Sequence, residues 1–139
     1  MPNLTNPELA FVLGRLLLGV NFLMHCLVRL PKLAGFRAGL VKQFAATPLP
    51  APLVDVFAAA LPFVEGGIGL VLLLGLFTRP ALAAAMLVII SLVVGSSLLE
   101  EWATVGSQML YGLFIITLIL HAQHNRLCLD RRLGRPEVV

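Results

Sequence analysis

Four long apolar runs divide the chain, at residues 9–30, 53–77, 81–99 and 103–121. Each run has between 19 and 25 residues, and a helix needs about 20 apolar residues to cross the hydrocarbon core of a bilayer. Only helices and closed barrels satisfy their peptide groups inside lipid, and these runs lack the alternation of barrel strands. The pattern predicts an all-α fold, a four-helix transmembrane bundle that forms a single integral membrane domain, residues 1–139.

The connections between the runs are unequal in length. Only Thr78, Arg79 and Pro80 join the second and third runs, so these two helices are expected to be antiparallel neighbours, with Pro80 in the first turn of the later one. The connection between the first and second runs, residues 31–52, is much longer. Apolar residues recur in it at helical spacing, which predicts an interfacial helix between spans one and two. These residues are Leu33, Phe36, Leu40 and Phe44.

The composition supports a membrane protein. Hydrophobic residues make up 59% of the chain and charged residues 12%, against about 25% charged in an average soluble domain, which excludes both a soluble domain and a disordered chain. The net charge of +3 does not indicate nucleic acid, because the cations lie at the ends of the apolar runs, where they anchor to headgroups. The expected partner is the lipid bilayer. With the N-terminus in the cytoplasm, five cations fall on that side and four on the other, which favours two cytoplasmic termini.

Two charged residues lie deep inside the predicted spans. Arg15 is six residues into the first span, and Glu65 is in the middle of the second. An ionised side chain at the centre of a helix costs about 2.5–3.5 kcal/mol on insertion scales, which favours pairing. Counted from the end that the two spans share, Arg15 is about 21 Å deep and Glu65 about 18 Å deep, so we expect an ion pair between them. His25, about 6 Å deep, and Asp55, about 3 Å deep, are expected to pair nearer the membrane surface.

These predicted pairs have two interpretations. They are either structural ion pairs that fix the packing or a site for a proton or a ligand. Pro62 removes one helical hydrogen bond from the second span, and Gly66 and Gly67 weaken the same stretch, which favours a binding cavity beside the carboxylate. The alternative is that the glycines only allow close helix packing.

His25 is open to the same choice. It is either a hydrogen-bonded structural residue or a proton relay, a quinone contact or an axial ligand. Haem held by two histidines is excluded, because His121 and His124 lie at the opposite end of the predicted bundle. Cys26 and Cys128 are separated in the same way, so no disulfide is expected between them. Metal-binding and nucleotide-binding spacings are not found in the sequence, so no metal site and no tightly bound cofactor are predicted.

A series of short motifs resembles the DoxX family of small four-helix membrane proteins. The motifs are GRLLLG at 14–19, MHC at 24–26, VEGG at 64–67, LGLFTR at 74–79 and RLCLD at 126–130. Their order and their placement on the predicted spans extend the resemblance over nearly the whole chain. A cysteine follows the histidine where the family usually has glycine, and a QHN sequence replaces the Gly-Pro-Gly turn that usually begins the last motif.

The resemblance implies a multi-pass protein of a prokaryotic cytoplasmic membrane, and it transfers no agreed catalytic residues. The family includes DoxD, a membrane subunit of a thiosulfate:quinone oxidoreductase. This implies a quinone-contacting or partner-docking subunit of a membrane redox system, at most one subunit of a quinone-linked oxidoreductase. Two alternatives stay open: a non-catalytic anchor or assembly subunit, and a small-solute or lipid carrier that works as a homo-oligomer. By matching position, the family-like polar residues are Arg15, His25, Glu65 and Arg79. Gly19 and Asp130 are further positions with a structural or family-like role.

Overall fold

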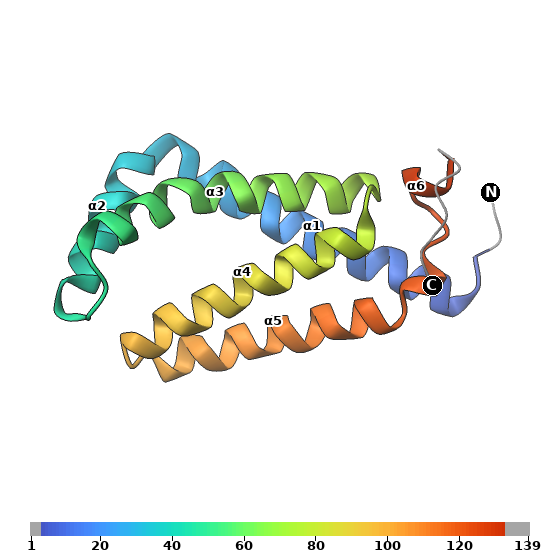
Figure 1. The fold of residues 1–139 in the computed structure, drawn as a ribbon. Helices are drawn as coiled ribbons and strands as arrows, with labels where there is room; N and C mark the ends of the chain where they lie inside the picture. Colours follow the sequence, from blue (N-terminus) through green and yellow to red (C-terminus); the bar gives the residue numbers. More distant parts are fainter. Residues whose placement is uncertain (1–3, 133–139) are drawn as a thin grey trace.

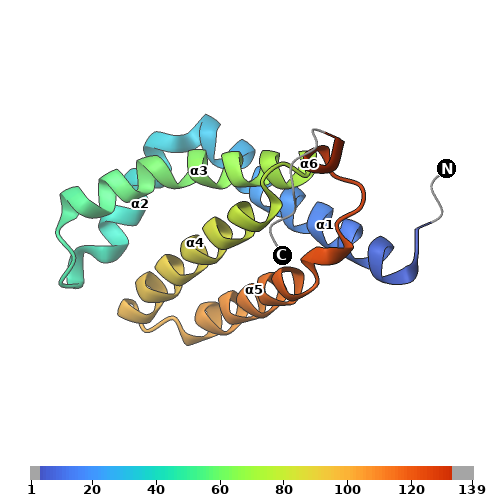
Figure 2. The same cartoon turned by 45° about the vertical axis from the view of Figure 1, so that its right-hand side comes forward.

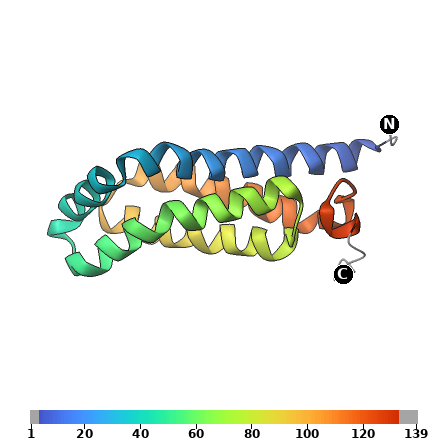
Figure 3. The same ribbon diagram turned by 90° about the horizontal axis from the view of Figure 1, so that it is seen from above.

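The computed structural model describes residues 4–132, and the predicted domain extends beyond them at both ends. Within this part of the chain four helices are long and apolar enough to cross a membrane, which confirms the all-α bundle. They are α1 (Asn6–Arg29), α3 (Ala51–Leu74), α4 (Thr78–Leu98) and α5 (Trp102–Leu120). Figures 1 and 3 show them in two layers, with α1 and α3 side by side over α4 and α5.

The turn between α3 and α4 is as tight as predicted. Helix α3 ends at Leu74, before the end of the apolar run at 53–77, because Gly75 adopts the left-handed conformation with φ 66°. Its backbone N donates to Leu72 O, and Leu76 N donates to Val71 O, which satisfies two of the last carbonyl groups of α3. The two helices are antiparallel, and the distance between them increases away from this turn (Figure 1).

The predicted helix in the first connection is present. The chain continues from α1 through the 3₁₀ turn η1 (Leu30–Lys32) into α2 (Leu33–Gln43) and the 3₁₀ turn η2 (Phe44–Ala46). No residue of α2 itself is buried, and the helix packs along the first half of α3. The side-chain amide of Gln43 donates to Glu101 at 2.8 Å, so the end of α2 reaches the turn between α4 and α5.

The chain after α5 folds back over the turn between α3 and α4 (Figure 2). This segment contains η3 (Ala122–His124) and α6 (Leu129–Arg132). Asp130 contacts both sides of the turn: its backbone N donates to Gly75 O at 3.2 Å, and its carboxylate accepts from Thr78 N at 3.3 Å. A carboxylate at the first N–H groups of α4 also complements the helix dipole.

Glycines bring α1 and α3 into close contact. A Cβ atom at Gly69 would lie 2.5 Å from Leu23 N and 2.8 Å from Gly19 O, and one at Gly66 would lie 2.6 Å from Cys26 Sγ. At Gly67 a Cβ atom would meet nothing within 4 Å. Gly66 and Gly69 therefore allow close packing of α1 against α3, whereas Gly67 lies where a side chain would have space. Helix α3 also contains the buried Pro62, and its axis curves in its first half (Figure 1).

The core lies where the two layers meet. Leu18, Leu72, Leu82 and Ile115 come from the four long helices and are almost completely buried. Many large apolar side chains remain exposed on the outside of the bundle, as expected for a surface that faces lipid. The inside of the bundle is thus apolar except at a few positions, two of which are the charged residues Arg15 and Glu65.

Two alanine substitutions in α3 test the close contact. Gly69→Ala is expected to lower the free energy of unfolding by about 1–3 kcal/mol, because the added methyl group would press on the backbone of α1. Gly67→Ala is the matched control and is expected to leave stability unchanged or to raise it by up to about 1 kcal/mol, since alanine is the better helix former. Denaturant titration in mixed micelles measures both changes. Equal losses in the two variants would contradict the contact.

Candidate functional site

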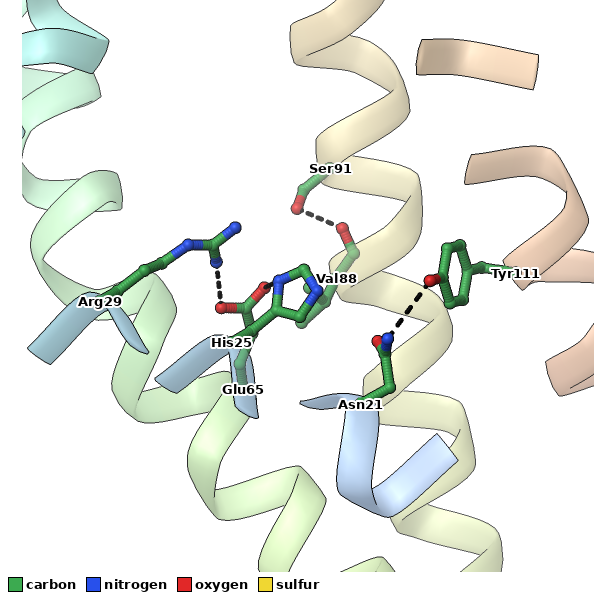
Figure 4. A network of polar contacts seen from close by, with 7 residues as sticks. All are labelled: Asn21, His25, Arg29, Glu65, Val88, Ser91 and Tyr111. Atoms are coloured by element: carbon green, nitrogen blue, oxygen red, sulfur yellow. Dashed lines mark hydrogen bonds and ion pairs between the residues drawn. The ribbon is translucent and has the colours of Figure 1, made fainter. Parts of the chain in front are cut away.

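The polar cluster of the bundle is centred on Glu65, in the middle of α3. Its side chain is only 3% exposed and has two partners from the last turns of α1. Arg29 donates from Nη1 to Glu65 Oε2, and His25 Nδ1 lies 3.6 Å from Glu65 Oε1 (Figure 4). We refer to Glu65, Arg29 and His25 as the Glu65 cluster.

Local sequence explains how these three side chains meet. His25 and Arg29 are four residues apart, so both project from the same face of α1. Gly66, next to Glu65, lets α1 approach α3 closely at Cys26. The guanidinium of Arg29 also lies over the Phe36 ring of α2, with Cζ 4.9 Å from the ring centroid, which adds a cation–π contact.

The three side chains differ in their access to the surroundings. The Arg29 side chain is 23% exposed and that of His25 is 43% exposed, whereas Glu65 is enclosed. The buried carboxylate therefore has a fixed cation behind it and an imidazole that opens to the outside of the bundle. Imidazole gains and loses a proton near neutral pH and both donates and accepts hydrogen bonds. The cluster can hold a proton or bind the polar end of a molecule that reaches it from outside.

A second polar contact lies beside the cluster. Asn21 Nδ2, one turn before His25 on α1, donates to the hydroxyl of Tyr111 on α5 at 3.3 Å (Figure 4). Ser91 of α4 appears in the same view, where its hydroxyl donates to Val88 O at 2.7 Å. The polar side chains of α1 in this view therefore contact α3, through Glu65, and α5, through Tyr111.

The predicted ion pair between Arg15 and Glu65 is wrong. Arg15 donates from Nη2 to Leu127 O at 2.8 Å, and its Nη1 lies against Gly75 at the end of α3. Gly75 is ten residues beyond Glu65, a separation of about 15 Å along a helix axis. Arg15 is buried, and its charge is placed at the partially negative C-terminal end of α3.

The wrong pairing comes from the register of α1 against α3. The depth count placed the end of the first span level with the start of the second, as a short turn would. Instead α2 continues the chain and covers the first turns of α3. As a result Cys26 is the residue beside Gly66, so the last turns of α1 rather than its middle lie opposite Glu65.

The predicted pair between His25 and Asp55 is wrong for the same reason. Asp55 accepts two hydrogen bonds from Arg37 of α2, at 2.8 and 2.5 Å. The structure thus brings together His25 and Glu65, leaves Arg15 and Asp55 elsewhere, and adds Arg29. Arg29 counted in the sequence only as a cation at the end of a span, although its four-residue spacing from His25 is a signal that could have identified it.

The other residues singled out from the sequence lie outside this cluster. Gly19 belongs to the contact between α1 and α3, and Asp130 caps the turn between α3 and α4. Arg79 is exposed at that turn, at the opposite end of α3 from α2. Neither Arg79 nor Asp130 takes part in the interactions of Glu65.

Comparison with known proteins places the chain in a family. The DoxX family model matches residues 10–99, well over half of the chain. The matched region contains all three residues of the Glu65 cluster, and it ends before α5. No curated protein and no solved structure matches the chain.

A double-mutant cycle tests which arginine pairs with Glu65. Arg29→Gln is expected to lower the free energy of unfolding by about 3 kcal/mol, because it leaves a buried carboxylate without its cation. Adding Glu65→Gln should recover part of this loss, with a coupling energy of about 1–3 kcal/mol. Arg15→Gln combined with Glu65→Gln is the control, and the two effects should add within about 0.5 kcal/mol. Comparable coupling to both arginines, measured by denaturant titration, would contradict the assigned partners.

Proposed function

Because the chain belongs to the DoxX family of integral membrane proteins, we propose that it is a quinone-contacting subunit of a membrane redox system. One observation supports this proposal most directly. A buried carboxylate, Glu65, is joined to an imidazole, His25, that opens to the outside of the bundle. Glu65 and His25 both lie on helices that are long and apolar enough to span a bilayer.

The position of His25 limits the kind of molecule that can reach it. The outside of the bundle is apolar, so a ligand that approaches from there has to be soluble in lipid. It also needs a polar group, because exposed polar side chains inside hydrocarbon are costly unless they are paired. A quinone meets both requirements, since it carries two ring oxygens on an apolar body.

The residues of the cluster have separate roles in this proposal. Arg29 compensates the charge of Glu65 and holds the carboxylate in place, and Glu65 orients the imidazole through Nδ1. His25 contacts a ring oxygen. Oxidation of a quinol to a quinone releases two protons and two electrons. In this proposal His25 accepts one proton, the proton of the opposite hydroxyl leaves to water at the membrane surface, and a redox partner protein takes both electrons. The chain's own contribution is therefore binding and proton transfer.

A second candidate function is a non-catalytic assembly subunit. It is favoured by the way ion pairs join the elements: Arg37 links α2 to Asp55 of α3, and Arg29 links α1 to Glu65 of α3. If these contacts only fix the packing, the cluster needs no ligand, and its substitution changes stability alone.

Quinone binding separates the two candidates. The protein in lipid nanodiscs is expected to bind a short-tailed 1,4-benzoquinol, whose hydroxyl can donate to His25, above the level of empty nanodiscs. His25→Leu removes the polar contact at similar volume and should weaken binding at least tenfold, a change of about 1.4 kcal/mol in binding free energy. His121→Leu, which alters an exposed histidine at the other end of the bundle, is the matched control and should bind as the wild type does. Unchanged quinol affinity in His25→Leu, or wild-type protein that binds no quinol, would overturn the proposal.

A further inference from the structure

The contact between Asn21 and Tyr111 lies one helical turn from His25 and has no role in the Glu65 cluster. Asn21 and His25 are four residues apart on α1, so they share one face at a separation of about 6 Å along the axis. Tyr111 reaches the same face from α5 and is 37% exposed. Figure 4 shows Asn21, His25 and Tyr111 gathered on this side of α1. Two polar positions are therefore presented side by side on the outside of an apolar bundle.

The hydrogen bond between Asn21 and Tyr111 does not use the hydrogen of the Tyr111 hydroxyl. Its oxygen accepts from Asn21 Nδ2 at 3.3 Å, so the hydroxyl hydrogen is available for a different acceptor. Among the described residues no acceptor is found for it. Inside a membrane an unpaired hydroxyl is unfavourable because lipid tails offer no acceptor. A ligand oxygen that accepts from the Tyr111 hydroxyl would therefore be favourable here.

The imidazole of His25 has the opposite polarity. Its Nδ1 faces the carboxylate of Glu65 at 3.6 Å, and this partner favours the neutral tautomer with the proton on Nδ1. The other ring nitrogen, Nε2, then carries a lone pair that accepts a hydrogen bond. Asn21, which contacts the Tyr111 hydroxyl, lies one turn of α1 before His25. Neighbouring turns of α1 are therefore associated with a hydrogen-bond donor, the Tyr111 hydroxyl, and a hydrogen-bond acceptor, His25 Nε2.

We infer that Tyr111, positioned by Asn21, is the second binding position of the quinone site. This inference rests on the proposed function. A six-membered ring with oxygens at opposite corners spans a distance similar to one helical turn, so one oxygen can lie at His25 and the other at Tyr111. A quinol hydroxyl donates to His25 Nε2, and the opposite oxygen accepts from the Tyr111 hydroxyl. The site therefore selects rings with two opposed oxygens over rings with one.

The experiment compares two probes of equal tail length. One is a short-tailed 1,4-benzoquinol and the other is a phenol with the same tail and a single ring oxygen. Wild-type protein in nanodiscs is expected to bind the quinol about five- to tenfold more tightly than the phenol, which corresponds to one net hydrogen bond. Tyr111→Phe removes only the hydroxyl, so it should weaken quinol binding by this factor and leave phenol binding unchanged. His25→Leu should weaken both probes.

Two further variants make the result specific to this position. Asn21→Leu should reduce the preference for the quinol in part, because Tyr111 loses the group that orients it. Thr117→Val is the matched control: it deletes another exposed hydroxyl of α5, one that donates within its own helix to Leu113 O at 2.9 Å. This variant should keep the wild-type preference.

The outcomes distinguish the two proposals. Wild-type protein that binds the quinol, together with a Tyr111→Phe variant of unchanged preference, overturns the second binding position and leaves the proposed function standing. Wild-type protein that binds neither probe overturns both. A preference for the quinol that disappears in Tyr111→Phe and persists in Thr117→Val supports the inference.

Discussion

The close contact between α1 and α3 determines where the charged side chains of the bundle lie. The two backbones can meet because Gly19 and Gly69 have no side chains at the point of closest approach. Sliding α1 by one turn would bring a residue with a Cβ atom to this point, so the register has few alternatives. In this register Arg29 and His25 lie opposite Glu65. A packing contact between uncharged residues thus determines which charged side chains pair inside the bundle.

The Glu65 cluster combines an ion pair between Arg29 and Glu65, whose net charge is zero, with the imidazole of His25, which is exposed at the outside of the bundle. A buried carboxylate is tolerated in lipid when a cation and hydrogen bonds compensate it, and Arg29 provides both. An ion pair with only a structural role would need no further polar partner. The additional presence of His25 on the outer side, followed by Asn21 and Tyr111 one turn away, extends the polar interior to the surface of the bundle. This continuity from the buried carboxylate to the exterior is the physical basis for proposing that the site binds a ligand.

The helices could be predicted from the sequence and the pairings could not. Bilayer thickness sets the length of an apolar run, so each of the four runs is recognisable by itself, and His25 and Glu65 stand out as polar residues inside apolar runs. Pairing depends on how far α2 carries the chain past the end of α1, and no local pattern in residues 31–52 determines this distance. Arg29 lies at the end of the first apolar run, where cations usually contact lipid headgroups. Its position alone therefore did not indicate that it pairs with Glu65. The contacts of Asp130 join residues far apart in the chain and leave no periodic signal.

The position of Asp130 relates the order of synthesis to the order of folding. It caps the turn between α3 and α4, and Leu127 of the same segment accepts from Arg15 of α1. These contacts join residues that leave the ribosome early to residues that leave it after all four long helices. The four long helices can enter the membrane one after another while this end of the bundle is still open, and it closes only when residues 122–132 emerge. A nascent chain that stops before residues 122–132 are made would hold the four long helices described here and yet keep that turn uncapped.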